Sequence, residues 1–275
     1  MMEGNPYGRV SVLRAVGDLH GGETKLENVY CTAPFKLLPP LPLRDGGAAV
    51  TQLSVSAGLL AGDRQQIDLR MGAGTYVRWT FQSYEKLHRM PPGFRAERNC
   101  RVAVEPGALL DYRPQPVIPH AGSDFRGRTR ITLRDKSARL IYGDILCCGR
   151  VAMGERFKFR RYRNLVEITC GGRLIYRDNT DLHPEQSTPE GLGMFEGHTH
   201  AASLILCNTE YDILHIRNLL EKQCQGGRFL FAVTALNSKD MVVRMLGYSA
   251  QELESAINSI VIRNIRSCQD AHNVR

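Results

Sequence analysis

Histidines and acids in strand-like segments are the residues of this chain whose types and spacing could hold a metal ion. His198 and His200 open an alternating segment that ends at Cys207, and in an extended chain both imidazoles point to the same side. They either share a soft cation there or are two ordinary surface histidines. A tight zinc site needs four ligands at recognisable spacing, which the sequence does not offer. Any metal held by this pair, with Cys207 as a secondary candidate, is expected to bind loosely.

Single acids also interrupt segments that are otherwise apolar or rich in turns, namely Asp63, Asp111, Asp144, Glu155 and Asp178. Each acid can simply pair with one of the many arginines, as Asp178 can with Arg177. The alternative is that several of them line one water-filled interior passage. Carboxylates suit a borderline cation that must be held weakly and then released.

Motifs of the common catalytic classes are missing. Ser83 lies in the sequence FQSYE and not in GxSxG, so it is not on a nucleophile elbow. His88 and Asp63 would complete a serine triad only by chance. No glycine-rich phosphate loop is present, so the chain is not a nucleotide hydrolase. The sequence thus carries no recognisable catalytic motif, and a stand-alone β-helical hydrolase or lyase is kept as an alternative function.

The composition is that of a folded protein with a positive surface. The 275 residues are 43 % apolar and 23 % charged, with a net charge of +8. The basic clusters lack any helix-turn-helix, zinc-finger or RNP-like pattern, so we expect an acidic protein partner and no nucleic acid, with an RNA-binding module as the weaker alternative. No apolar run is long enough to span a membrane and no secretion signal is visible, so we expect a cytoplasmic protein with reduced cysteines.

Alternating apolar and polar residues, with a turn about every ten residues, predict an all-β architecture. The expected strands include residues 9–16, 24–31, 94–105, 128–133, 138–148, 157–162 and 164–170, with a turn at 17–22. Residues 33–43 carry four prolines and should run along a sheet edge. Periodicity alone indicates a sandwich, while recurring Gly-Ala-Gly and Pro-Gly-Ala turns hint at a helical winding of strands. No linker divides the chain, so we expect one domain, 1–275.

Two helices are expected late in the chain. The first covers residues 209–223, includes Leu219, and has Thr209 as its predicted N-cap. The second begins at a capping box, residues 249–252, and places Ile257 and Ile260 on one apolar face.

The order of these motifs resembles the UreD family of urease accessory proteins, whose members are also called UreH. The resemblance covers nearly the whole chain and rests on residues 33–42, 56–90, 106–133, 147–159, 175–180 and 193–208. Gly-Asp, Gln-Ser, Pro-x-Pro-x-Ile-Pro and Gly-Arg-x-Ala-x-Gly-Glu follow one another as in that family. The segments FKL and FKF and the run EKLHR look most like the UreH branch. His120 stands where the family often has Phe.

The resemblance implies two stacked sheets with β-helix-like winding, two C-terminal helices and no catalytic activity. It also implies a complex with UreF-like and UreG-like accessory proteins that docks on apo-urease and helps nickel reach its metallocentre. No cofactor would be tightly bound, and nickel(II) would pass transiently through an interior tunnel. The tunnel residues map here to Asp63, Ser83, Asp144 and Glu155. The helices near Leu219, Ile257 and Ile260 are the expected UreF contact.

Overall fold

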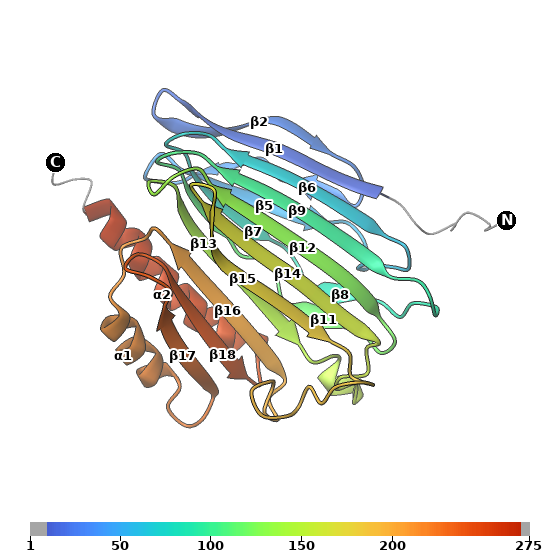
Figure 1. Ribbon diagram of the computed structural model, residues 1–275. Coiled ribbons are helices and arrows are strands. Elements are labelled where there is room, and N and C mark those ends of the chain that lie inside the picture. Colours follow the sequence, from blue (N-terminus) through green and yellow to red (C-terminus); the bar gives the residue numbers. More distant parts are fainter. Residues whose placement is uncertain (1–9, 271–275) are drawn as a thin grey trace.

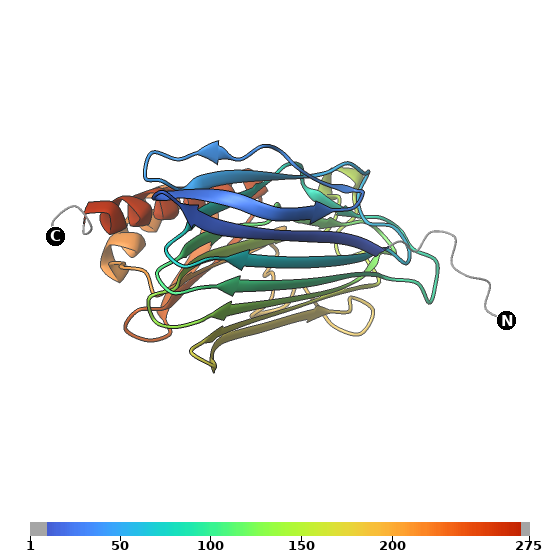
Figure 2. The same ribbon diagram turned by 90° about the horizontal axis from the view of Figure 1, so that it is seen from above.

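The computed structural model describes residues 10–270, with side chains described through Ile262. Two stacked β-sheets make up most of it, and two helices follow late in the chain (Figure 1). The seven-stranded sheet has the order β15 (Arg173–Leu182), β14 (Arg161–Cys170), β12 (Asp124–Leu133), β9 (Ala96–Val104), β6 (Arg64–Met71), β1 (Val10–His20) and β2 (Glu23–Cys31). Figure 2 shows these strands as one twisted layer.

The eleven-stranded sheet faces it. Its main path is β17 (Phe229–Ala235), β18 (Met241–Gly247), β16 (His200–Cys207), β13 (Arg139–Cys147), β10 (Leu109–Tyr112), β7 (Tyr76–Phe81), β5 (Ala48–Ser54) and β3 (Phe35–Leu37). The short strands β4 (Leu41–Pro42), β8 (Glu85–Leu87) and β11 (Val117–Pro119) join it beside this path. The proline-rich segment therefore lies at a sheet edge, as expected, because proline cannot donate to a ladder.

From β5 to β14 the chain passes back and forth between the two sheets. The strands of this winding pair in parallel with their neighbours in the same sheet, as in β6 with β9 and β7 with β10, whereas the outer pairs such as β14 with β15 and β13 with β16 are antiparallel. This winding is a β-solenoid of about four turns, in which each turn hydrogen-bonds to the one before within both sheets, and the two sheets bury their facing sides against each other. The mainly β architecture, the two sheets and the winding are confirmed.

The alternation of side chains produces the core. Ile67, Leu69 and Met71 point inward from β6, and the polar residues between them point outward. Trp79 on β7 is fully buried, and its indole N–H donates to Gln52 at 2.9 Å.

Several strand predictions were wrong in their bounds. β12 begins at Asp124, four residues before the expected start at 128, because the register with β9 and β14 extends to Phe125 and Asp124. β1 continues through residues 17–20, because Gly17 fits against Val77 and the hairpin pairing with β2 runs on to His20. The turn is only Gly21 and Gly22, both with positive φ. Residues 157–160 form no strand, because Phe157 has a positive φ. A single strand covers 161–170 in place of the two expected ones.

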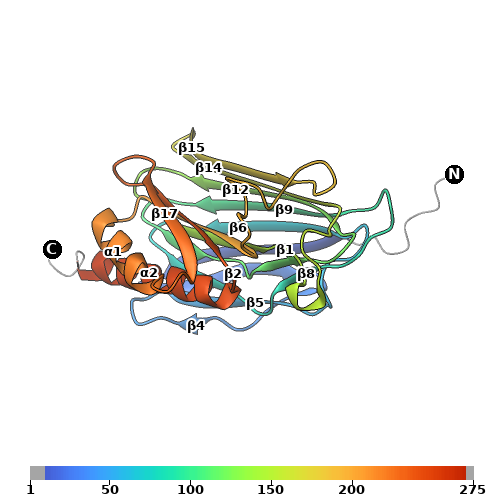
Figure 3. The same cartoon turned by 90° about the horizontal axis from the view of Figure 1, so that it is seen from below.

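Helices α1 (Ile213–Gln223) and α2 (Ala250–Asp270) lie on the side of the eleven-stranded sheet away from the other sheet (Figure 3). The Asp212 carboxylate accepts hydrogen bonds from the backbone N–H groups of Leu214 and His215, so Asp212 is the N-cap of α1. The prediction of Thr209 was wrong, because the chain is still extended there. The Ser249 hydroxyl accepts from the Glu252 N–H at 3.4 Å, in keeping with the predicted cap of α2. No helix in the described part of the chain is long and apolar enough to cross a membrane.

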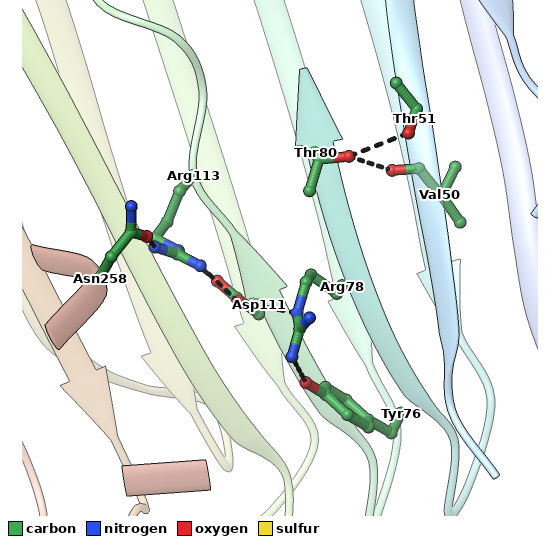
Figure 4. Close-up of polar contacts among 8 residues, drawn as sticks. All are labelled: Val50, Thr51, Tyr76, Arg78, Thr80, Asp111, Arg113 and Asn258. Atoms are coloured by element: carbon green, nitrogen blue, oxygen red, sulfur yellow. Dashed lines mark hydrogen bonds and ion pairs between the residues drawn. The ribbon is translucent and has the colours of Figure 1, made fainter. Parts of the chain in front are cut away.

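A polar network ties α2 to the sheet beneath it (Figure 4). The buried Asp111 carboxylate accepts two hydrogen bonds from Arg113, at 2.6 and 2.8 Å, and lies 3.8 Å from Arg78. Arg113 also donates to Asn258 on α2. Because a buried carboxylate needs partners, this network fixes where α2 sits.

Candidate functional site: a polar layer between the sheets

One row of inward-facing residues on the seven-stranded sheet is not apolar. Strand register places five residues side by side across β6, β9, β12, β14 and β15: Gln65, Arg98, Gly127, Asn164 and Thr180. Arg98 donates to Gln65 at 2.7 Å and forms an ion pair with Glu85. The row is thus polar on strands whose other inward residues are mostly apolar.

The facing sheet carries a matching row. Asp144 on β13 pairs with Ser203 on β16, which pairs with Arg244 on β18. The other inward residues of β13 are Leu140, Tyr142 and Leu146.

These two rows divide the interior. Ile131, Tyr142 and Val166 belong to the larger hydrophobic cluster between the sheets, whereas Phe125 and Leu146 belong to a second one. On β12, β13 and β14 the polar or glycine position lies between a residue of the larger cluster and a residue of the second cluster. The sequence therefore builds a polar layer through an apolar interior. This layer contributes less hydrophobic stabilisation than apolar side chains at the same positions would.

Two cavities are lined in part by residues of the polar layer. The first, of about 180 Å³, is lined by residues that include Ser83, Glu85 and Arg98. The second, of about 540 Å³, extends past Asp178 and Arg244 toward residues 193–196. Three residues line both cavities: Asp144, Tyr162 and Asn164. Asp144 therefore borders both cavities at the polar layer.

Asp144 has the electrostatics of a weak cation ligand. Burial raises the pKa of its carboxyl to about 7, and the negative charge of Asp178 adds to the rise. The Tyr142 hydroxyl donates to Asp144 at 3.5 Å, and Arg244 donates to Asp178 at 2.7 Å. When Asp144 is ionised, Asp144, Asp178 and Arg244 together carry a charge of −1; when it is protonated they are neutral.

The four predicted tunnel residues do not lie together. Ser83 and Asp144 line the first cavity, whereas Asp63 and Glu155 line neither. The Asp63 carboxylate accepts from the Leu60 N–H at 2.8 Å and closes a turn. Glu155 accepts from both Arg150 and the Ala121 N–H, and the hydrogen bonds from Arg150 lower its pKa to about 2.

His198, His200 and Cys207 each have other contacts. The His198 ring lies 4.7 Å from the Tyr248 ring, with Nδ1 3.0 Å from the Phe195 carbonyl oxygen. His200 contacts the Thr199 hydroxyl, and burial lowers its pKa. Burial in the main core raises the pKa of the Cys207 thiol well above its ordinary value, which disfavours the thiolate that metals bind. No group of three or more His, Cys, Asp or Glu side chains placed to hold a metal occurs in the described part of the chain.

The apolar helix residues expected to contact a partner face inward. Ile257 and Ile260 are 4 % and 0 % exposed and pack on the eleven-stranded sheet with Leu219 at the margin of that cluster. The outer faces of the helices instead expose Leu214 by 68 % and Ile262 by 53 %.

Sequence reasoning missed Asn164, Thr180, Ser203 and Arg244. A usable signal existed for Asn164, which shares strand parity with Tyr162, Val166 and Ile168 and is the one polar residue among them. Two strands were expected here, 157–162 and 164–170, and the break between them concealed that Tyr162 and Asn164 face the same side of one strand. Ser203 and Arg244 carried no signal, because small or charged residues are ordinary on a strand.

Comparison with known proteins finds relatives that match nearly the whole chain. The family model described as "UreD urease accessory protein" matches residues 9–273. The urease accessory protein UreD of Acetivibrio thermocellus is 37 % identical, over 95 % of this chain and 98 % of that protein. The urease accessory protein UreH of Helicobacter pylori is 35 % identical, over 90 % and 92 %. UreD of Flavobacterium johnsoniae is 28 % identical, over 91 % of each. This chain therefore belongs to the UreD family of urease accessory proteins, which act as non-catalytic scaffolds in urease maturation.

Proposed function

We propose that the two cavities connect into one polar passage, and that this protein helps to load urease by passing nickel(II) along it, with Asp144 as a transient ligand. The single observation that carries the proposal is the polar layer, which crosses a mostly apolar interior and contributes Asp144 to the lining of two cavities. Weak oxygen ligands suit an ion that must move on, because thiolate or multiple histidine ligands would hold it.

The pKa of Asp144 supports release as well as binding. A carboxyl that titrates near pH 7 binds a proton or a cation with a small change in conditions. Because Arg244 pairs with Asp178, ionisation of Asp144 changes the sum of these three charges from 0 to −1, which favours a cation at this place.

Ser83 is proposed as a second contact on the first cavity. Its exposed hydroxyl lies in the loop between β7 and β8, where a positive φ turns the chain. Asp63 and Glu155 are proposed to hold turns near this passage rather than to contact the ion, since each already has backbone or arginine partners. His198, His200 and Cys207 are left as secondary candidates.

The proposed partners are apo-urease and accessory proteins of the UreF and UreG kinds, in a cytoplasmic complex. The relatives are named as urease accessory proteins, which supports a role in such an assembly. We place the UreF-like contact on the outer faces of α1 and α2, around Leu214 and Ile262, because the inward residues are already buried. A stand-alone hydrolase or lyase lacks support, because family members are accessory proteins.

The experiment is activation of apo-urease by the complete accessory set with limiting nickel. Asp144→Asn removes the ionisable oxygen while keeping the shape, and we expect the initial rate of activation to fall about tenfold. Asp18→Asn, on the exposed end of β1, is the matched control and should activate like the unaltered protein. Full activation by Asp144→Asn would remove Asp144 from the route. Failure of the unaltered chain to support activation at all would overturn the proposed function itself.

A further inference from the structure

The outer face of the seven-stranded sheet, which faces the viewer in Figure 1, is hollowed along its centre. A groove of about 530 Å³ lies over β1, β6, β9 and β12. Four arginines and one acid line it: Arg14, Arg70, Arg101, Arg130 and Asp68. We call this the arginine groove; its lining charges sum to +3.

Strand register explains the shape of the arginine groove. One row across the sheet reads Arg14, Asp68, Arg101 and Arg130 from β1 to β12. The next row contains Val16 and Ala103, whose short side chains leave the floor low between long arginines. On one strand every second side chain points outward, so the long arginines of one row lie beside the short side chains of the next. The guanidinium groups therefore surround a shallow hollow.

Two of the four guanidinium groups have partners on this protein. Arg70 pairs with Glu105 at 3.2 Å, and Arg130 lies 3.6 Å from Glu167. Arg14 and Arg101 are exposed, and within residues 10–262 neither has a carboxylate oxygen within 4.0 Å, although Asp68 stands between them in the row. In the described part of the chain, the arginine groove therefore contains two guanidinium groups without a carboxylate partner and two that already pair with a glutamate.

The residue types favour carboxylates over a nucleic-acid chain. Every basic residue on these four strands is arginine, apart from His20 at the end of β1, and none is lysine; the planar fork of arginine matches a carboxylate with two hydrogen bonds. The outward positions of these strands carry no aromatic side chain on which unpaired bases could stack. Asp68 would repel a continuous phosphate backbone but can accept a backbone N–H from a peptide.

We propose that the arginine groove docks an acidic segment of a partner protein, through aspartate and glutamate carboxylates that pair with Arg14 and Arg101. This inference goes beyond the proposed nickel passage and does not depend on it, since the groove is on the opposite side of the sheet from the polar layer.

The test uses the full chain and a fluorescein-labelled peptide of six Glu-Ala repeats, with binding followed by anisotropy at low and physiological salt. Arg14→Gln with Arg101→Gln should weaken the peptide about tenfold, because two charge-assisted contacts are lost. Arg173→Gln with Arg228→Gln removes the same charge from exposed sites elsewhere and should change binding less than about twofold. Unchanged circular dichroism and melting temperature show that both double variants are folded.

Three results would overturn the proposal. The first is no binding of the peptide by the unaltered chain at low salt. The second is an equal loss with both double variants, which would mean attraction by net charge alone. The third is that a six-nucleotide oligothymidylate binds more tightly than the peptide through Arg14 and Arg101, which would make the groove a nucleic-acid surface. Activation of urease is not the readout, so failure here is separable from failure of the nickel proposal.

Discussion

Asp144 and Glu155 carry opposite pKa shifts for different physical reasons. The pKa of Asp144 is raised because its carboxyl is removed from water and lies near Asp178. The pKa of Glu155 is lowered because Arg150 donates hydrogen bonds to its carboxylate. Both acids interrupt strand or turn patterns in the sequence, and the sequence could identify them as unusual. It could not separate them, because the separation depends on which arginine the fold brings near each carboxyl.

The raised pKa of Asp144 makes stability depend on pH. Between the ordinary pKa of an aspartate and about 7, the folded protein binds more protons at this site than the unfolded chain, so stability falls as pH rises through that window. Asp144→Asn removes this loss. The melting temperature of the variant relative to the unaltered protein should therefore be higher at pH 8 than at pH 4.5, by at least about 2 °C. Equal differences at both pH values would contradict the burial of this charge.

Glu155 should show the reverse dependence. Its folded pKa is below the ordinary value, so its contribution is present above about pH 4.5 and is lost as pH falls toward about 2. Glu155→Gln should lower the melting temperature at pH 7, and the difference should shrink as the pH approaches 3. Thermal unfolding followed by circular dichroism measures both. A difference that grows on acidification would show that the Arg150 pair does not stabilise the turn.

At the scale of elements, the sequence placed the two helices and most strands but not their limits. Strand alternation and turn glycines are local, so β6, β7 and β18 could be predicted well. The start of α1 depends on how the chain leaves β16, and a Thr and an Asp three residues apart are both good caps. The structure decides between them, since Thr209 is buried and its hydroxyl has no partner in the described part of the chain.

The two candidate caps of α1 predict different stabilities. Asp212→Ala should lower the free energy of unfolding by about 1 kcal/mol, because two backbone N–H groups lose their acceptor. Thr209→Val removes a buried hydroxyl without a partner at nearly constant volume and should leave stability unchanged or higher. Urea denaturation measures both. A larger loss for Thr209→Val than for Asp212→Ala would restore Thr209 as the cap.

The faces of α2 can be separated in the same way. Ile260→Ala should cost about 2–5 kcal/mol, since the side chain is fully buried. Ile262→Glu should leave the unfolding free energy within about 0.5 kcal/mol, because its side chain is half exposed. If the outer face binds a UreF-like protein, Ile262→Glu should reduce co-purification with it. Intact co-purification with both Ile262→Glu and Leu214→Glu would move the contact elsewhere.

At the scale of the whole molecule, sequence periodicity could predict β structure but not how the strands wind. A sandwich and a β-solenoid share the same alternation, and only the order in which strands enter the two sheets distinguishes them. The family resemblance supplied that order. The polar layer also emerges only at this scale, because strand register aligns Gln65 and Asn164 in one row, and the stacking of the two sheets sets that row opposite the row of Arg244.

The central claim is that nickel travels through the junction of the two cavities, and a physical block tests it most directly. Asn164 lines both cavities, so Asn164→Trp should fill the junction, whereas Asn164→Ala removes the same amide and leaves it open. The measurement is nickel bound per urease active site after activation with each purified, folded variant. We predict that Asn164→Trp lowers the nickel content at least about fivefold while Asn164→Ala keeps it near that of the unaltered protein. Full nickel content with Asn164→Trp would contradict the passage.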